Sequence, residues 1–267
     1  MSKRVLRNVS VVGAMAAGAI LAAGGAAQAA PDVTSVGNNG ILNGNQAVVP
    51  IQVPINVCGN AVAVLGVAGA GCDGGASADM GHGGRHESGA LGDMVSAGNN
   101  GIANGNQVQA PIQVPVNVCG NAVGALIGVA GAGCDGGADA DLGHGGHDRE
   151  GGKVTEAKNT ALTAGNQGIG NGNQLIAPIQ VPVNVCGNAI AVLGVAGAGC
   201  DGGADADLGH HAAPDMVSAG NNGILNGNQA FVPIQVPVDI SGNAIAVAGV
   251  AGAGSTGGAD ADLGPSR

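Results

Sequence analysis

Hydrophobic and polar residues alternate along a short segment that occurs four times in this chain. In its first copy, residues 51–58 read Ile-Gln-Val-Pro-Ile-Asn-Val-Cys, so that every second position is Ile or Val. A period of two is typical of a β-strand with two unlike faces. Proline within such a run restricts it to an edge strand or an irregular strand. The pattern therefore predicts an irregular β-strand over residues 51–58.

A second apolar run follows at once. Residues 60–67 read Asn-Ala-Val-Ala-Val-Leu-Gly-Val, without proline and without charge, which is typical of β-segments that aggregate. Gly59-Asn60, between the two runs, is a two-residue hairpin signal. An α-helix remains an alternative for the second run, because it is rich in alanine. We expect a strand.

The stretches around these runs are rich in turn-forming residues. Upstream, Asn38-Asn39-Gly40 and Asn43-Gly44-Asn45 predict loops. Downstream, a straight strand would carry Cys72 more than ~30 Å from Cys58, at ~3.3 Å per residue. If the two sulfur atoms bond, the chain must turn back near Leu65 and Gly66. The prediction is then a small meander.

Internal repetition organises the whole chain. The repeats occupy residues 37–72, 98–134, 165–200 and 220–255. Segments at 73–97, 135–164 and 201–219 read as linkers, and residues 256–267 as a C-terminal tail. The spacing between repeats varies, unlike the near-constant period of a solenoid. We therefore predict a mainly β chain of four small disulfide-stapled hairpin or meander units, joined by flexible Gly/Asp-rich linkers.

Charge is confined almost entirely to the linkers. The first three repeats carry no charged residue, and the fourth carries only Asp239. All six histidines lie between repeats, as in His82-Gly83-Gly84-Arg85-His86. The chain is thus a block amphiphile of neutral apolar units and polar, mostly acidic spacers.

Composition excludes several classes of protein. The chain has 54 glycines, one phenylalanine and neither tryptophan nor tyrosine, so a single large packed core is not expected. With 45% hydrophobic and 10% charged residues, it is also unlike a typical disordered chain. A net charge of −10 excludes a basic nucleic-acid footprint and disfavours binding to anionic membranes.

Residues 1–29 have the pattern of an export signal. Lys3, Arg4 and Arg7 form a positive start, residues 11–23 are apolar but too short to span a bilayer, and Ala27-Gln28-Ala29 is a cleavage site. No later segment is long and apolar enough to be a transmembrane helix. We expect a secreted protein, and outside the cytosol cysteines tend to pair.

The six cysteines predict three disulfides within repeats. Each of the first three repeats has two cysteines, and in the fourth Ser241 and Ser255 replace both. Joint loss is the outcome that pairing within a repeat predicts, because pairing between repeats would leave single cysteines behind. Each bridge closes a loop of ~15 residues, worth ~3 kcal/mol in the chain-entropy model. The expected pairs are Cys58–Cys72, Cys119–Cys134 and Cys186–Cys200.

Other candidate chemistry is weak. Gly202-Gly203-Ala204-Asp205-Ala206-Asp207-Leu208 recurs at 136–142 and 257–263, and faintly resembles a calcium-binding nonapeptide. The alternative is an acidic linker, which we prefer, and the histidine clusters are open to metal binding, to pH sensing or to a plain spacer role. The cysteine spacing is too wide for a zinc knuckle. No catalytic constellation recurs, so we expect no enzymatic activity, no cofactor and no metal site.

The sequence resembles the chaplin family of filamentous, spore-forming bacteria. The resemblance rests on Val-Pro-Val-Asn-Val-Cys-Gly-Asn at 114–121 and 181–188 and on Val-Pro-Ile-Asn-Val-Cys-Gly-Asn at 53–60. It includes the Gly-Asn turn region before this core and the second cysteine some 14 residues later. Chaplins usually carry Asn-Pro-x-Phe-Gly-Asn before that cysteine, where this chain has Gly69-Ala70-Gly71.

The resemblance implies a secreted surface protein that assembles into amyloid-like films at air–water interfaces, coats aerial filaments and spores, and aids attachment. The implied partners are other copies of the chain and an air–water or cell-wall surface. Because Leu263-Gly264-Pro265-Ser266-Arg267 is not an apolar sorting tail, we expect the association with the cell wall to be non-covalent. The block-amphiphile pattern favours the same function. A soluble extracellular adhesin, or a metal-tuned spacer or binding module, is the alternative.

Overall fold

The computed structural model describes residues 32–80, 91–142, 160–209 and 213–263. In these ranges all regular secondary structure is β-strand, which confirms the expected mainly β class and the strand in the second apolar run. The same eight strands occur in each repeat. The predicted export signal and all six histidines lie outside the described residues.

The strand boundaries are as follows. The first repeat has β1 (Val33–Val36), β2 (Asn39–Ile41), β3 (Gln46–Val48), β4 (Ile51–Gln52), β5 (Ile55–Cys58), β6 (Ala61–Ala63), β7 (Val67–Asp73) and β8 (Ala76–Met80). The second has β9 (Met94–Ala97), β10 (Asn100–Ile102), β11 (Gln107–Gln109), β12 (Ile112–Gln113), β13 (Val116–Cys119), β14 (Ala122–Ala125), β15 (Val129–Asp135) and β16 (Ala138–Leu142). The third has β17 (Thr160–Ala164), β18 (Gln167–Ile169), β19 (Gln174–Ile176), β20 (Ile179–Gln180), β21 (Val183–Cys186), β22 (Ala189–Val192), β23 (Val195–Asp201) and β24 (Ala204–Asp207). The fourth has β25 (Asp215–Ala219), β26 (Asn222–Ile224), β27 (Gln229–Phe231), β28 (Ile234–Gln235), β29 (Val238–Ser241), β30 (Ala244–Val247), β31 (Val250–Thr256) and β32 (Ala259–Asp262).

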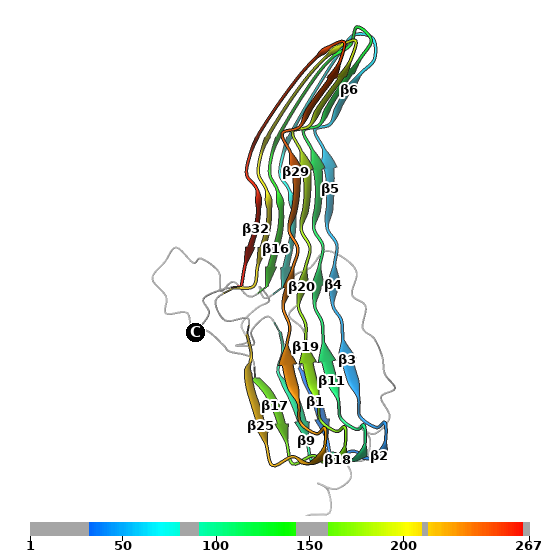
Figure 1. The fold of residues 1–267 in the computed structure, drawn as a ribbon, viewed down its shortest axis with the longest axis vertical. Coiled ribbons are helices and arrows are strands. Elements are labelled where there is room, and N and C mark those ends of the chain that lie inside the picture. Colours follow the sequence, from blue (N-terminus) through cyan, green and yellow to red (C-terminus); the bar gives the residue numbers. More distant parts are fainter. Residues whose placement is uncertain (1–31, 81–90, 143–159, 210–212, 264–267) are drawn as a thin grey trace, which may run out of the picture.

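Each strand pairs with the equivalent strand of the neighbouring repeat. All pairs are parallel and in register, as in β13, where Val116 lies beside Ile55 on one side and Val183 on the other. The result is eight four-stranded sheets, each with the repeats stacked as layers in the order one to four (Figure 1). Every paired residue therefore lies above its counterpart in the next repeat.

This pairing corrects the expected arrangement of the repeats. Strands of one repeat do not pair as a hairpin, and the four repeats are not separate units on flexible strings. The unequal spacing that argued against stacking is accommodated between strands such as β8 and β9, outside the ladders. Equal length of the paired segments is sufficient for stacking, and it lets identical side chains form ladders.

The path of the chain within a layer is a meander without hairpin pairing. From β3 to β6 the chain runs along the long arm, reverses at Val64-Leu65-Gly66, and returns through β7 and β8 (Figure 1). The predicted reversal near Leu65 and Gly66 is confirmed. Gly59-Asn60 is not a hairpin turn, because β5 and β6 continue in the same sense on either side of it. Gly59 has a φ of 62°, and the chain bends there.

Prolines divide one extended run into β3, β4 and β5. The breaks fall at Val49-Pro50 and Val53-Pro54, and the same breaks recur in the other repeats. The carbonyl groups of Pro50 and Pro54 accept hydrogen bonds from Ile112 and Val116 of the next layer, at 2.8 and 2.9 Å. Proline has no N–H to donate, so the ladder is interrupted at these positions.

Part of the sequence assigned to linkers is also in the stack. β8 and β9 lie within residues 73–97, and the Gly-Gly-Ala-Asp-Ala-Asp motif forms β16, β24 and β32 rather than a solvated linker. Similarly, Asn39-Gly40-Ile41, in a stretch predicted as loop, forms the short strand β2. Weak strand signals become strands because the equivalent segments of the adjacent repeats offer pairing partners for each of them.

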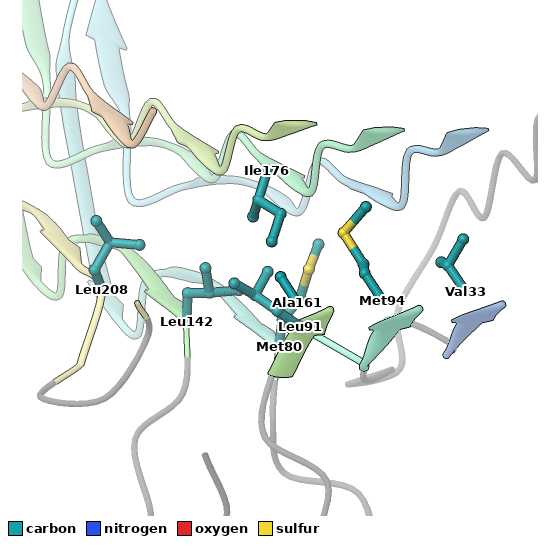
Figure 2. Close-up of a cluster of buried hydrophobic side chains, with 8 residues drawn as sticks. All are labelled: Val33, Met80, Leu91, Met94, Leu142, Ala161, Ile176 and Leu208. Atoms are coloured by element: carbon teal, nitrogen blue, oxygen red, sulfur yellow. The ribbon is translucent and has the colours of Figure 1, made fainter. Parts of the chain in front are cut away.

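Three small cores lie between facing sheets, and the core at the base includes residues of β1, β9 and β17, which precede the outward strands of their layers. At the base, Ile176 points from one sheet towards Ala161, Leu142 and Met94 (Figure 2). Along the arm, the cores consist of stacked alanines and of stacked cysteines. Small side chains let the sheets approach closely, which explains how a chain nearly without aromatic residues buries an interior.

Candidate interaction surface

The outer side of the long arm is covered by Val and Ile side chains. We call this surface the valine face; it comprises Ile51, Val53, Ile55, Val57, Ile112, Val114, Val116, Val118, Ile179, Val181, Val183, Val185, Ile234, Val236, Val238 and Ile240. In the first layer Ile55 and Val57 are 67% and 65% exposed. Four aligned layers thus present a continuous apolar sheet surface, and large exposed apolar patches mark interaction sites.

The polar half of the alternating pattern points inward. Gln113, Asn117, Gln180 and Asn184 are at most 1% exposed, although each lies between two residues of the valine face. The side-chain amide of Gln180 donates to Gln113 of the layer before it at 3.0 Å, and to two carbonyl groups of the facing sheet. Buried amides are normally hydrogen-bonded. In-register stacking supplies those bonds, and this fixes which side of the strand faces water.

The three disulfides hold the interior in place. The structure brings together Cys58 with Cys72, Cys119 with Cys134 and Cys186 with Cys200, each within one repeat and with a Cα–Cα distance of 5.8 Å. Each bond joins the outward and the returning strands of one layer. Because all the cysteines point inward, the alternating Val and Ile residues on the same strands must point outward.

Glycine is required beside each disulfide. A Cβ atom on Gly120 would lie 2.8 Å from the Cβ atom of Cys134 and 2.9 Å from the carbonyl oxygen of Gly199. Gly120 also has a φ of 63°, which disfavours other residues. The Cys-Gly-Asn sequence therefore sets the bend of the arm where the sulfur atoms meet.

The opposite outer side of the arm is glycine-rich and acidic. Its strands stack aspartates in three ladders, which we call the aspartate face: Asp73, Asp135 and Asp201; Asp139, Asp205 and Asp260; Asp79, Asp141, Asp207 and Asp262. The arm is thus an amphiphile, with apolar side chains on one outer side and carboxylates on the other.

Stacking of like charges changes the ionisation of two of these groups. Partial burial raises the pKa of Asp139 above the usual 3.8, and the charge of Asp205 raises it further. Burial and then the charge of Asp260 raise the pKa of Asp205. Both side chains remain exposed on their outer side, so desolvation here comes from the neighbouring layers. Carboxylates at the ~4.8 Å spacing of strands repel one another.

The metal sites and pH sensors weighed from the sequence are not formed by the described residues. Within the described ranges, no group of three or more His, Cys, Asp and Glu residues could hold a metal ion, and no helix could cross a membrane. The Asp-rich motif weighed as a calcium site lies along the ladders of the aspartate face. The histidine clusters weighed as metal sites or pH sensors lie outside the described residues.

The sequence pattern predicts the alternating strand but does not identify the valine face or the aspartate face as surfaces. Period-two patterning cannot say which side of a strand is buried. The position of the cysteines in phase with Gln and Asn was the available signal, because a disulfide within a repeat requires that side to point inward.

Comparison with known proteins identifies the repeats. A profile of the chaplin domain, ChpA-C, matches residues 13–77, 83–136, 150–203 and 202–259, which is well over half of the chain. The chain belongs to the chaplin family. No solved structure matches this chain significantly.

Several chaplins of Streptomyces coelicolor are similar to parts of this chain. Chaplin-B is 32% identical over 110 residues, Chaplin-C 42% over 106 and Chaplin-D 48% over 58. These alignments cover 33%, 34% and 20% of this chain, respectively. The chain spans about half or less of Chaplin-B and Chaplin-C (46% and 40%), and 77% of Chaplin-D. This chain carries four copies of the chaplin domain. Each alignment with these three relatives covers only part of the four-repeat chain.

Proposed function

We propose that this chaplin is a secreted, non-enzymatic, surface-active protein that assembles at air–water or cell-surface interfaces. The observation that carries the proposal is the presence of the valine face and the aspartate face on opposite outer sides of one arm. Transfer of apolar side chains out of water is favourable by ~25 cal/mol per Å². At an air–water interface the valine face leaves water, while the carboxylates of the aspartate face stay hydrated.

The same architecture supports self-assembly. The intramolecular stack already has the parallel, in-register pairing of cross-β structure, and its first and last layers carry sheet edges that pair with no described residue. We propose that assembled films are amyloid-like, that they coat aerial filaments and spores, and that they aid attachment without a covalent link to the wall. The three disulfides act as staples that keep the first three layers folded before assembly.

Surface tension of the purified, oxidised protein tests this function. We expect a large drop for the unmodified chain and a β-rich film that binds thioflavin. A variant with Val57, Val118, Val185 and Ile240 all replaced by Thr should lower surface tension less, because one row of the valine face has become polar.

The matched control replaces another exposed row, Ile41, Ile102, Ile169 and Ile224 at the base of the stack, with Thr. This control has the same number of changes but leaves the valine face intact, so it should retain surface activity. Equal loss in both variants would show that the valine face has no special role. No drop for the unmodified chain would favour a soluble adhesin or spacer.

A further inference from the structure

The fourth repeat differs from the others at the positions that would contact a further layer. One side-chain ladder runs through Asn56, Asn117, Asn184 and Asp239. In it, the amide of each repeat donates to the oxygen of the next, at 2.8 Å from Asn56 to Asn117 and 2.9 Å from Asn117 to Asn184. The last step, from Asn184 to Asp239 Oδ1, is 2.8 Å.

Asp239 accepts that hydrogen bond but has no hydrogen to donate to a further layer. An ionised carboxylate is an acceptor only, whereas Asn has both a donor and an acceptor. The second oxygen of Asp239 is also engaged, because Ser241 Oγ donates to it at 2.7 Å. In the middle repeats this partner is a cysteine sulfur, which accepts from Asn at 3.0 Å. The Asn-to-Asp and Cys-to-Ser differences therefore form one unit, in which the hydroxyl donates to the carboxylate.

At the other end of the stack the same ladder lacks a donor. The amide of Asn56 gives its two hydrogens to Asn117 and to the carbonyl group of Gly74, the latter at 3.0 Å. Its Oδ1 accepts no hydrogen bond from the described residues. If a second copy of the chain were added in register, its Asn56 Oδ1 would meet Asp239 where the ladder requires an N–H.

We propose that the fourth repeat caps the stack against end-to-end addition of a second copy, and that Asp239 with Ser241 is the capping pair. The inference rests on the proposed self-assembly: the edges of the first and last layers allow end-to-end addition, and the capping pair makes that addition slower. A carboxylate facing the Asn56 oxygen leaves one acceptor unpaired at the junction and places negative charge against it. Terminal repeats with an atypical outer surface have this role in other stacked-repeat proteins.

The Asp239→Asn variant tests the cap with little change in shape. The new side-chain amide would still accept a hydrogen bond from Asn184, and it would supply the N–H that Asn56 of the next copy needs. We expect seeded fibril elongation of this variant to be about tenfold faster than that of the unmodified chain, the effect of about one well-formed hydrogen bond on an equilibrium.

Asp260→Asn is the matched control, because it removes the same charge from the same layer. In an in-register junction Asp260 would lie over the uncharged Ser77, so its replacement repairs no hydrogen bond. Equal acceleration by Asp239→Asn and Asp260→Asn, or no acceleration by Asp239→Asn, would overturn the cap.

A second variant shows which edge is used. Ala61 N donates to the second layer at 2.8 Å, so the N–H of the next residue, Val62, points away from the stack. Adding Val62→Pro to Asp239→Asn should remove the acceleration, because the first layer then presents one donor fewer to the incoming copy. Retained acceleration would show that copies do not join through this edge and would overturn the cap. Surface tension, which depends on the valine face, separates failure of the cap from failure of the proposed function.

Discussion

At the scale of single residues, stacking multiplies the effect of each side chain. A residue that bonds to its counterparts does so in every layer, and one that cannot is isolated between unlike neighbours. Gln107 and Gln109 show both situations on one strand, β11. Gln107 donates to Gln46 at 3.1 Å and to two carbonyl groups, and it accepts from Gln174 at 2.8 Å. Gln109 is fully buried, and neither of its side-chain polar atoms has a hydrogen-bond partner among the described residues.

Replacing Gln109 with Val should therefore stabilise the protein. Its ladder neighbours are Val48 and Ile176, so valine restores an apolar row and removes a desolvation cost of about 1–3 kcal/mol. Gln107→Val, two residues away, should destabilise by a similar amount because it leaves bonded partners unpaired. Denaturant midpoints of the two variants would measure this difference, and a loss of stability in Gln109→Val would contradict the packing described.

The acidic ladders predict a dependence of stability on pH. The folded pKa values of Asp139 and Asp205 lie above the usual 3.8, so the folded state holds more protons than the unfolded state just above that pH. Stability from these groups is therefore fully present below pH 3.8 and is lost as pH rises through the folded pKa values. The double variant Asp139→Asn, Asp205→Asn should be more stable than the unmodified chain at about pH 7, with a smaller difference near pH 4. Parallel pH profiles of the unfolding midpoint would contradict this.

At the scale of elements, the strands depend on neighbours in other repeats, which limits what sequence can predict. The alternation in residues 51–58 was predictable because it is a local pattern. The turn near Leu65 was predictable because the expected Cys58–Cys72 bond requires the chain to reverse between the two cysteines. The strand β16 was not, because an Ala-Asp-Ala-Asp segment becomes a strand only between two copies of itself. Likewise, Gly59-Asn60 has the composition of a hairpin turn, but the chain only bends there. The Cys58–Cys72 disulfide leaves no room for a Cβ atom at position 59.

Some glycines in the strands and bends lie in close contact with the next layer, whereas others face open space. A Cβ atom on Gly137 would lie 2.4 Å from the carbonyl oxygen of Gly203 in the next layer, whereas one on Gly131 would have no neighbour within 4 Å. Gly137→Ala should therefore destabilise by more than ~1 kcal/mol, because two backbones must separate. Gly131→Ala should be neutral or slightly stabilising, because alanine restricts the unfolded chain. Equal thermal unfolding midpoints for the two variants would contradict the stacked register.

We expect the repeats to differ in stability according to their place in the stack. The fourth repeat has no cysteine, its outer sheet edge pairs with no described residue, and all residues of β30 and β32 are exposed. Limited proteolysis of the oxidised chain should cut in the fourth repeat and between repeats before it cuts elsewhere. Preferential cleavage within the first repeat, which has a free edge but keeps its disulfide, would contradict a stabilising role of the staple.

At the scale of the whole molecule, the four repeats form one amphiphilic stack because the strand edges of adjacent repeats pair with one another. A single repeat has no large core, and its Gln and Asn side chains would lack partners. Stacking supplies those partners, buries the polar side of each strand, and gathers the Val and Ile residues into one surface. The unequal spacing of the repeats argued against stacking in the sequence. The differences in length lie between the paired segments, so they do not change the register of the strands.

A distance between the first and last layers distinguishes the in-register stack from four independent repeats. Spin labels introduced as noncanonical residues at Val67 and Val250, which are 85% and 64% exposed, would leave the disulfides intact. Three layer steps of ~4.8 Å predict a Cα–Cα separation of about 15 Å, with a narrow distribution in pulsed electron paramagnetic resonance. A broad distribution centred at several tens of ångströms would show independent repeats and contradict the stack.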